Sequence, residues 1–173
     1  VMSSQIRNNS CGKTNKDGSF AIQSKATEES LYRIKFERGK YILLAVKNGD
    51  NAQIAGDWNQ LENYTVSGSA GSATLKGFLI NLRENIKDIQ TMQVILDSIS
   101  VKPKNDSLKK MAIDDLKNIN AKFVAYVKKF ADTTQSVASA LFAVNIINPA
   151  YETPYITEFY QKVTKRFPES KNA

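Results

Sequence analysis

The chain has 173 residues, of which 42% are apolar, and this suffices for one compact domain or two small ones. Apolar runs such as 140–144 are far too short to span a bilayer, so we expect a soluble protein with no membrane span. The net charge of +7 is spread over lysines and arginines that usually stand beside acids, and this favours solubility over a nucleic-acid partner.

The side chains offer little material for catalysis. Histidine is absent and Cys11 is the single cysteine, which rules out Ser–His–Asp and Cys–His nucleophiles, a His-ligated metal and an internal disulfide. The acidic pairs Glu28-Glu29 and Asp114-Asp115 are expected to be solvated surface, because adjacent side chains diverge on a strand or a helix. We therefore predict no catalytic residue, no cofactor and no metal.

The N-terminus shows no targeting signal of its own. It lacks the apolar core of a signal peptide, so any targeting segment has been removed or never existed. Cys11 follows Arg7-Asn8-Asn9, where a lipid-attachment motif requires apolar and small residues, so we expect a free thiol.

Up to about residue 70, apolar residues alternate at every second position between Gly, Asn and Asp turns, which predicts a β-rich subdomain over residues 1–70. In chain order, five short strands are expected over 19–23 (after Asp17-Gly18), 31–36, 41–46, 52–55 (after Asn48-Gly49) and 64–67. In the second strand, the apolar side chains at 32, 34 and 36 face inward and the cations at 33 and 35 face water. This spacing is typical of an antiparallel meander or sandwich.

From residue 71 the apolar residues recur every three or four positions, which predicts an α-helical subdomain over 71–173. The first helix is capped by Ser72 and is ended or kinked at Lys102-Pro103, and the second begins at Ser107. The third, over about 136–147, is apolar all round and therefore buried, and it ends at Asn148-Pro149. The fourth has Thr153 as N-cap with Pro154 in the first position and stops at Phe167-Pro168. The fold class is thus α+β, with an N-terminal antiparallel sheet or sandwich followed by a bundle of about four helices.

Four aromatic residues are candidates for contact with a partner: Trp58, Tyr64, Tyr151 and Tyr155. Trp58 lies in an expected loop with Tyr64 shortly after it, and exposed loop aromatics bind sugars or proteins. The alternative is that these two cover an open end of the sheet. Tyr151 and Tyr155 flank Pro154 and serve either an interface or helix packing.

The order of several short segments resembles a known domain. These segments are Asp17-Gly18-Ser19-Phe20, 31–34, 43–49 with its Asn-Gly turn, 54–57, and 64–69 followed by Ser72 and Leu75. Together they are similar to the N-terminal domain of unknown function that precedes the thioredoxin-like (AhpC/TSA–thioredoxin-like) domain of Gram-negative envelope proteins. The ending over 160–172 is similar to the segment that leads into that domain, so the resemblance covers about residues 13–173.

The resemblance implies an exported thiol–disulfide oxidoreductase, periplasmic or lipid-anchored at the cell envelope. A downstream thioredoxin-like domain would carry its CxxC, so no catalytic residue carries over to this chain. Residues 1–12 depart from the family pattern, since the usual first strand and its glycine are not evident. The expected function is a non-catalytic recognition or dimerisation domain, with a partner protein or a second copy as the partner. The alternative is a free-standing envelope protein that binds glycan or peptide through Trp58 and Tyr64.

Overall fold

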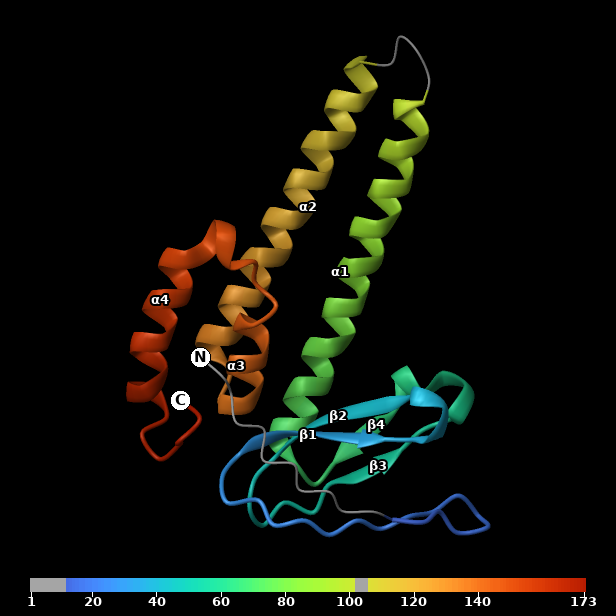
Figure 1. The fold of residues 1–173 in the computed structure, drawn as a ribbon, viewed down its shortest axis with the longest axis vertical. Coiled ribbons are helices and arrows are strands. Elements are labelled where there is room, and N and C mark those ends of the chain that lie inside the picture. Colours follow the sequence, from blue (N-terminus) through green and yellow to red (C-terminus); the bar gives the residue numbers. More distant parts are fainter. Residues whose placement is uncertain (1–11, 102–105) are drawn as a thin grey trace.

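The computed structural model describes residues 12–101 and 106–173, so Cys11 and the expected Lys102-Pro103 helix end lie outside the described residues. Four strands come first: β1 (Ser30–Lys35), β2 (Tyr41–Val46), β3 (Gln53–Ala55) and β4 (Thr65–Ser67). The short 3₁₀ helices η1 (Glu37–Gly39) and η2 (Trp58–Asn63) lie between them. Four α-helices follow: α1 (Ala70–Ser100), α2 (Asp106–Thr133), α3 (Val137–Val144) and α4 (Pro149–Arg166). The predicted α+β class, with strands before helices, is confirmed (Figure 1).

The described strands form two antiparallel pairs. β1 pairs with β2, placing Tyr32 opposite Leu44, and β3 pairs with β4. The predicted alternation of β1 is confirmed, since its even-numbered side chains are half-buried and its odd-numbered ones are exposed. The predicted strand over 19–23 is wrong. Within the described residues this segment joins no ladder, and Phe20 instead packs its ring edge-to-face on Phe36, with 6.0 Å between centroids.

The junction between sheet and helices is fixed by two buried hydroxyls. Ser69, not Ser72, is the N-cap of α1: Gly68 has a positive φ, Ser69 is extended, and its Oγ accepts from the Ser72 amide. Ser72 already lies inside the helix, and its Oγ donates to the carbonyl oxygen of Ala45 at 2.9 Å. The start of α1 is therefore bonded to β2 near the end of that strand.

Two further helix starts differ from the prediction. Ser107 lies inside α2, which begins at Asp106. Asn148-Pro149 opens α4 rather than ending α3, because the Asn148 side chain accepts from the Ala150 amide and proline occupies the first turn. Pro154 consequently lies within α4, where the backbone is kinked at Glu152.

The helical core is built around the predicted buried helix. α3 has most of its residues buried, and its apolar side chains pack with Phe78 of α1, Val127 of α2, and Phe159 and Val163 of α4. Ala45, Leu75 and Ala138 form a smaller cluster where β2, α1 and α3 meet. Figure 1 shows that α1 and α2 run side by side as a long hairpin whose far end extends beyond the strands and the shorter helices.

The expectation that Glu28-Glu29 is solvated surface is wrong, because both residues are half-buried. The Glu28 carboxylate accepts from the amides of Lys171 and Asn172, at 2.7 and 3.2 Å. The Glu29 carboxylate accepts from the Ser136 hydroxyl and from the Ala138 amide, at the N-terminus of α3. The two side chains diverge as expected, but each reaches polar groups from a distant part of the chain.

We expect Glu29→Ala to lower the free energy of unfolding by about 2 kcal/mol, because α3 loses a charged acceptor at its N-terminus. Asp115 is an exposed acidic residue of α2, and Asp115→Ala is the control. This variant should change the free energy of unfolding by less than about 0.5 kcal/mol. Urea denaturation measures both. Equal midpoints for the two variants would contradict the structural role of Glu29.

Candidate protein-contact surfaces

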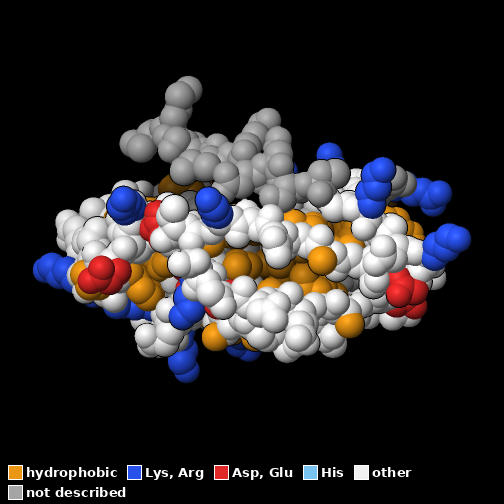
Figure 2. Space-filling view, turned by 90° about the horizontal axis from the view of Figure 1, so that it is seen from below, with side chains coloured by type: hydrophobic (Ala, Val, Ile, Leu, Met, Phe, Trp, Pro, Cys, Tyr) orange, Lys and Arg blue, Asp and Glu red, His pale blue; other side chains and the backbone are white. Residues whose placement is uncertain are grey.

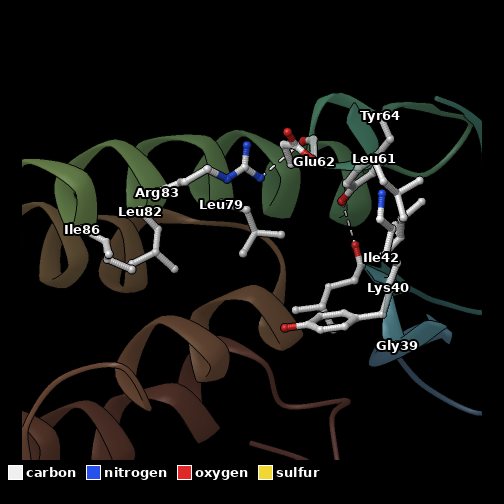
Figure 3. A pocket seen from close by; sticks show the side chains of 12 residues that line it. Gly39, Lys40, Ile42, Leu61, Glu62, Tyr64, Leu79, Leu82, Arg83 and Ile86 are labelled. Carbon is white, nitrogen blue, oxygen red and sulfur yellow. Dashed lines mark hydrogen bonds between the residues drawn. The ribbon is translucent and has the colours of Figure 1, made fainter. Parts of the chain in front are cut away.

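A groove of about 440 Å³ lies between β2, η2 and the first half of α1 (Figure 3). Figure 3 shows Leu79, Leu82 and Ile86 along α1 on one side, with Lys40 and Ile42 of the β2 segment across from them. Leu61 and Tyr64 close one end. The apolar residues that line the groove are Tyr41, Ile42, Leu43, Leu61, Tyr64, Leu79, Leu82 and Ile86.

Cations surround this apolar lining. Arg83 donates from Nη2 to the carbonyl oxygen of Glu62 at 3.3 Å, and Lys40 donates to the carbonyl oxygen of Trp58. Lys76, only 8% exposed, also donates to the Glu62 carbonyl, and its Nζ lies 4.1 Å from the centre of the Tyr64 ring. Burial and then the charge of Arg83 lower the pKa of Lys76. These three cations thus bond to backbone carbonyls, and the ion pairs found in the described part of the chain involve other lysines.

A second surface lies on the outer half of α1. Asp97 is the only charged residue between positions 89 and 101, although this stretch is largely exposed. Thr91, Val94, Ser98 and Val101 recur at helical spacing and form what we call the distal α1 face. Val94 is 68% exposed, and Val101, the C-cap of α1, is 83% exposed.

The polar groups of the distal α1 face are satisfied within the helix. Thr91 donates from Oγ1 to the carbonyl oxygen of Lys87, and Ser98 from Oγ to that of Ile95, both at 2.8 Å. Gln93, beside the face, donates to the carboxylate of Asp97. The four residues of the face therefore present methyl groups and no charge, and the exposed carboxylate of Asp97 lies beside Val94 and Val101.

The four aromatic candidates are not brought together. Tyr64 is only 4% exposed and donates to the carbonyl oxygen of Leu43, so it covers the sheet, in agreement with the alternative interpretation. Trp58 is 39% exposed and packs edge-to-face on Phe36. Both lie near the groove, whereas Tyr151 and Tyr155 belong to α4.

The α4 tyrosines differ from one another. Tyr155 lies against α2, where its hydroxyl is 3.2 Å from a carboxylate oxygen of Asp132 and 3.3 Å from the carbonyl oxygen of Lys128. Burial and the negative charge of Asp132 raise the pKa of Tyr155. Tyr155 thus serves helix packing, while Tyr151 is 83% exposed.

Sequence reasoning missed both surfaces. The distal α1 face had a signal in the sequence, since a stretch of exposed helix with a single charge is uncommon. The groove had no such signal, because Lys40, Glu62 and Arg83 converge only through the packing of η2 between β2 and α1.

Figure 2 views the strand-bearing end of the molecule, and it shows lysines and arginines dispersed around the periphery with apolar side chains along a hollow between them. The positive charge is not gathered into a patch on this face, as its scatter along the sequence predicts. Within 12–101 and 106–173, no cluster of side chains suited to a metal ion occurs, and no helix combines the length and apolarity needed to cross a bilayer.

No family model matches the chain, and neither the curated proteins nor the solved structures contain a match.

Proposed function

We propose that this chain is a non-catalytic accessory domain of an exported thioredoxin-like thiol–disulfide oxidoreductase, and that it joins two copies of that protein. The order of the short segments between residues 17 and 75 supports the family, and the distal α1 face supports the mode of action. A domain of this kind contributes no chemistry. It holds a second copy of the protein near the reactive centre that another domain carries. The effective concentration of one copy at the reactive centre of the other is thereby raised.

The single observation that carries this proposal is the methyl-rich face on the exposed half of α1, where Asp97 is the one charged residue between positions 89 and 101. The cores of protein interfaces are depleted in charged residues, and none of the four residues of the distal α1 face is charged. Figure 1 shows that this half of α1, with α2 beside it, extends beyond the sheet and the shorter helices, so a second hairpin can approach it without meeting the sheet or α4. In a two-fold symmetric dimer, the distal α1 face of one copy would pack against the same face of the other copy, because a two-fold interface uses the same surface on both subunits.

We expect the protein to self-associate and the double variant Val94→Glu/Val101→Glu to weaken self-association at least about tenfold, because charge is placed where water is excluded. Tyr151→Glu is the matched control, since Tyr151 and Val101 are equally exposed at 83%. Sedimentation velocity over a concentration series provides the measurement. A monomeric parent protein, or equal association of all three proteins, would contradict the role of this face.

The oxidoreductase part of the proposal has a separate test. Sequencing the gene beyond the codon of Ala173 should reveal a thioredoxin-like domain with a CxxC motif in the same reading frame. A stop codon there, or an unrelated domain, would refute the family assignment and leave the self-association result unaffected.

A further inference from the structure

We propose that the groove between β2, η2 and α1 binds an extended acidic segment of a partner protein. One bulky apolar side chain of that segment would lie against Leu79 and Ile86, with a neighbouring carboxylate beside Arg83 and Lys40. This inference goes beyond self-association and does not rest on it, because the groove lies on the earlier turns of α1 and not on the distal α1 face.

The groove is large enough for a bulky apolar side chain, and part of its apolar lining is exposed. A volume of about 440 Å³ lies within the range of roughly 300–1,000 Å³ that is typical of binding clefts. Two of the apolar residues that line it remain substantially exposed: Tyr41 at 54% and Ile86 at 42%. A bound apolar side chain would remove this surface from water, which is the main favourable term in association.

The charges select an anionic ligand. Arg83 and Lys40 line the groove, whereas Glu62 is the only acid among the described residues that do so. Among the described residues, the Arg83 guanidinium makes one hydrogen bond, to the Glu62 carbonyl, although an arginine has five N–H donors in a planar fork. The remaining donors fit a carboxylate, and Lys76 behind Tyr64 adds further positive charge.

The backbone of β2 favours a peptide over a lipid. Along β2, the carbonyls of Leu43 and Ala45 accept hydrogen bonds from Tyr64 and Ser72, so they face away from β1. Since backbone groups alternate in direction along an antiparallel strand, the N–H and C=O of Tyr41 also face away from β1, on the groove side. An extended peptide can pair with these groups, as in strand addition to a sheet edge, whereas an acyl chain cannot.

The probe for the test is a fluorescein-labelled nonapeptide, Gly-Asp-Leu-Glu-Phe-Asp-Leu-Glu-Gly, measured by fluorescence anisotropy with the full chain. We expect saturable binding, lost when lysines replace the acids and weakened when serines replace leucine and phenylalanine. Arg83→Glu and Ile86→Asp should each weaken binding at least about tenfold. Lys40→Glu is a further groove variant should either of these fail to fold, as judged by circular dichroism.

Two matched controls lie on the same helix. Lys87→Glu changes the same charge one turn beyond Arg83, and Ile80→Asp changes an isoleucine that is 41% exposed, against 42% for Ile86. Neither Lys87 nor Ile80 lines the groove, so both control variants should bind like the parent. Val94→Glu/Val101→Glu should also bind the peptide normally, and Ile86→Asp should self-associate normally, which separates this inference from the proposed function.

The inference is overturned by the absence of saturable binding at about 1 mM protein. It is equally overturned if the control variants lose as much affinity as the groove variants, since binding would then reflect net charge alone. Binding to vesicles of anionic phosphatidylglycerol that depends on Arg83 and Ile86, without binding to the peptide, would assign the groove to lipid and overturn the inference as well.

Discussion

Phe78→Ala should lower the free energy of unfolding by about 3–5 kcal/mol, the usual cost of removing a buried aromatic side chain. Phe78 is 1% exposed and stacks on Phe130 and Tyr126 of α2, with centroids 4.3 and 5.8 Å away. It also meets Phe142 of α3 edge-on at 6.2 Å. One side chain of α1 thus holds α2 and α3 in place, and its loss leaves a cavity that three helices would have to close.

A cost of this size is a large part of the roughly 5–15 kcal/mol by which a domain is stable, so the variant should unfold at a much lower urea concentration. Circular dichroism in the far ultraviolet follows the helices, and Trp58 fluorescence follows the strand-bearing end. Ile80→Ala, two positions further along α1 and 41% exposed, is the control and should cost less than about 1 kcal/mol. Similar losses for both variants would mean that the aromatic cluster is not the centre of the core.

The parts of the fold that were predicted correctly depend on local patterns. β1 alternates because one of its faces is covered, and it left an alternating pattern in the sequence. α3 is surrounded by other elements, and it left a run of apolar residues. The change from strands to helices near residue 70 was visible for the same reason. The division into a β-rich and an α-helical subdomain at this point stays a prediction, and Ala45, Leu75 and Ala138 pack together across it.

The errors arose where a local signal had two physical interpretations. An Asn-Pro pair can end one helix or open the next, and only the hydrogen bond from the Ala150 amide to Asn148 decides between them. The apolar alternation at 19–23 suits a strand, yet a strand also needs a neighbour with which to pair. The Glu28-Glu29 pair resembled a solvated surface because its partners lie more than one hundred residues later.

Of the two candidate surfaces, one depends on a local stretch of sequence and the other on contacts between distant segments. The distal α1 face lies within one stretch of sequence, so the scarcity of charge around it could have been found by counting charges between positions 89 and 101. The groove depends on η2 placing the Glu62 carbonyl between Lys76 and Arg83, which no spacing rule anticipates. Trp58 and Tyr64 were named for their aromatic character, and they do lie near the groove, but burial leaves only Trp58 accessible.

Gly68→Ala should destabilise the protein by at least about 3 kcal/mol, for two reasons that can be separated. Gly68 has φ of +71°, a conformation that costs an alanine roughly 1–2 kcal/mol. A Cβ at this position would also lie 2.0 Å from the carbonyl oxygen of Asn51, at the backbone that leads into β3. Because backbone atoms cannot move aside as a side chain can, relief requires the chain before β3 to separate from the end of β4, and the Asn51–Gly68 hydrogen bond is lost.

Variants at two other glycines separate the conformational cost of a positive φ from the steric cost of the close approach to Asn51. Gly49 has φ of +85°, and a methyl group at this position would have no neighbouring atom within 4 Å, so Gly49→Ala should cost only the conformational part, about 1–2 kcal/mol. Gly77 lies in α1 with equally open surroundings, and Gly77→Ala should stabilise the protein by about 0.5–1 kcal/mol. Urea denaturation of the three variants should therefore rank Gly68→Ala below Gly49→Ala, with Gly77→Ala above the parent. If Gly68→Ala were no less stable than Gly49→Ala, the close approach of Asn51 to Gly68 would not exist in the folded protein, and the Ser69 cap that follows Gly68 would have to be positioned by other contacts.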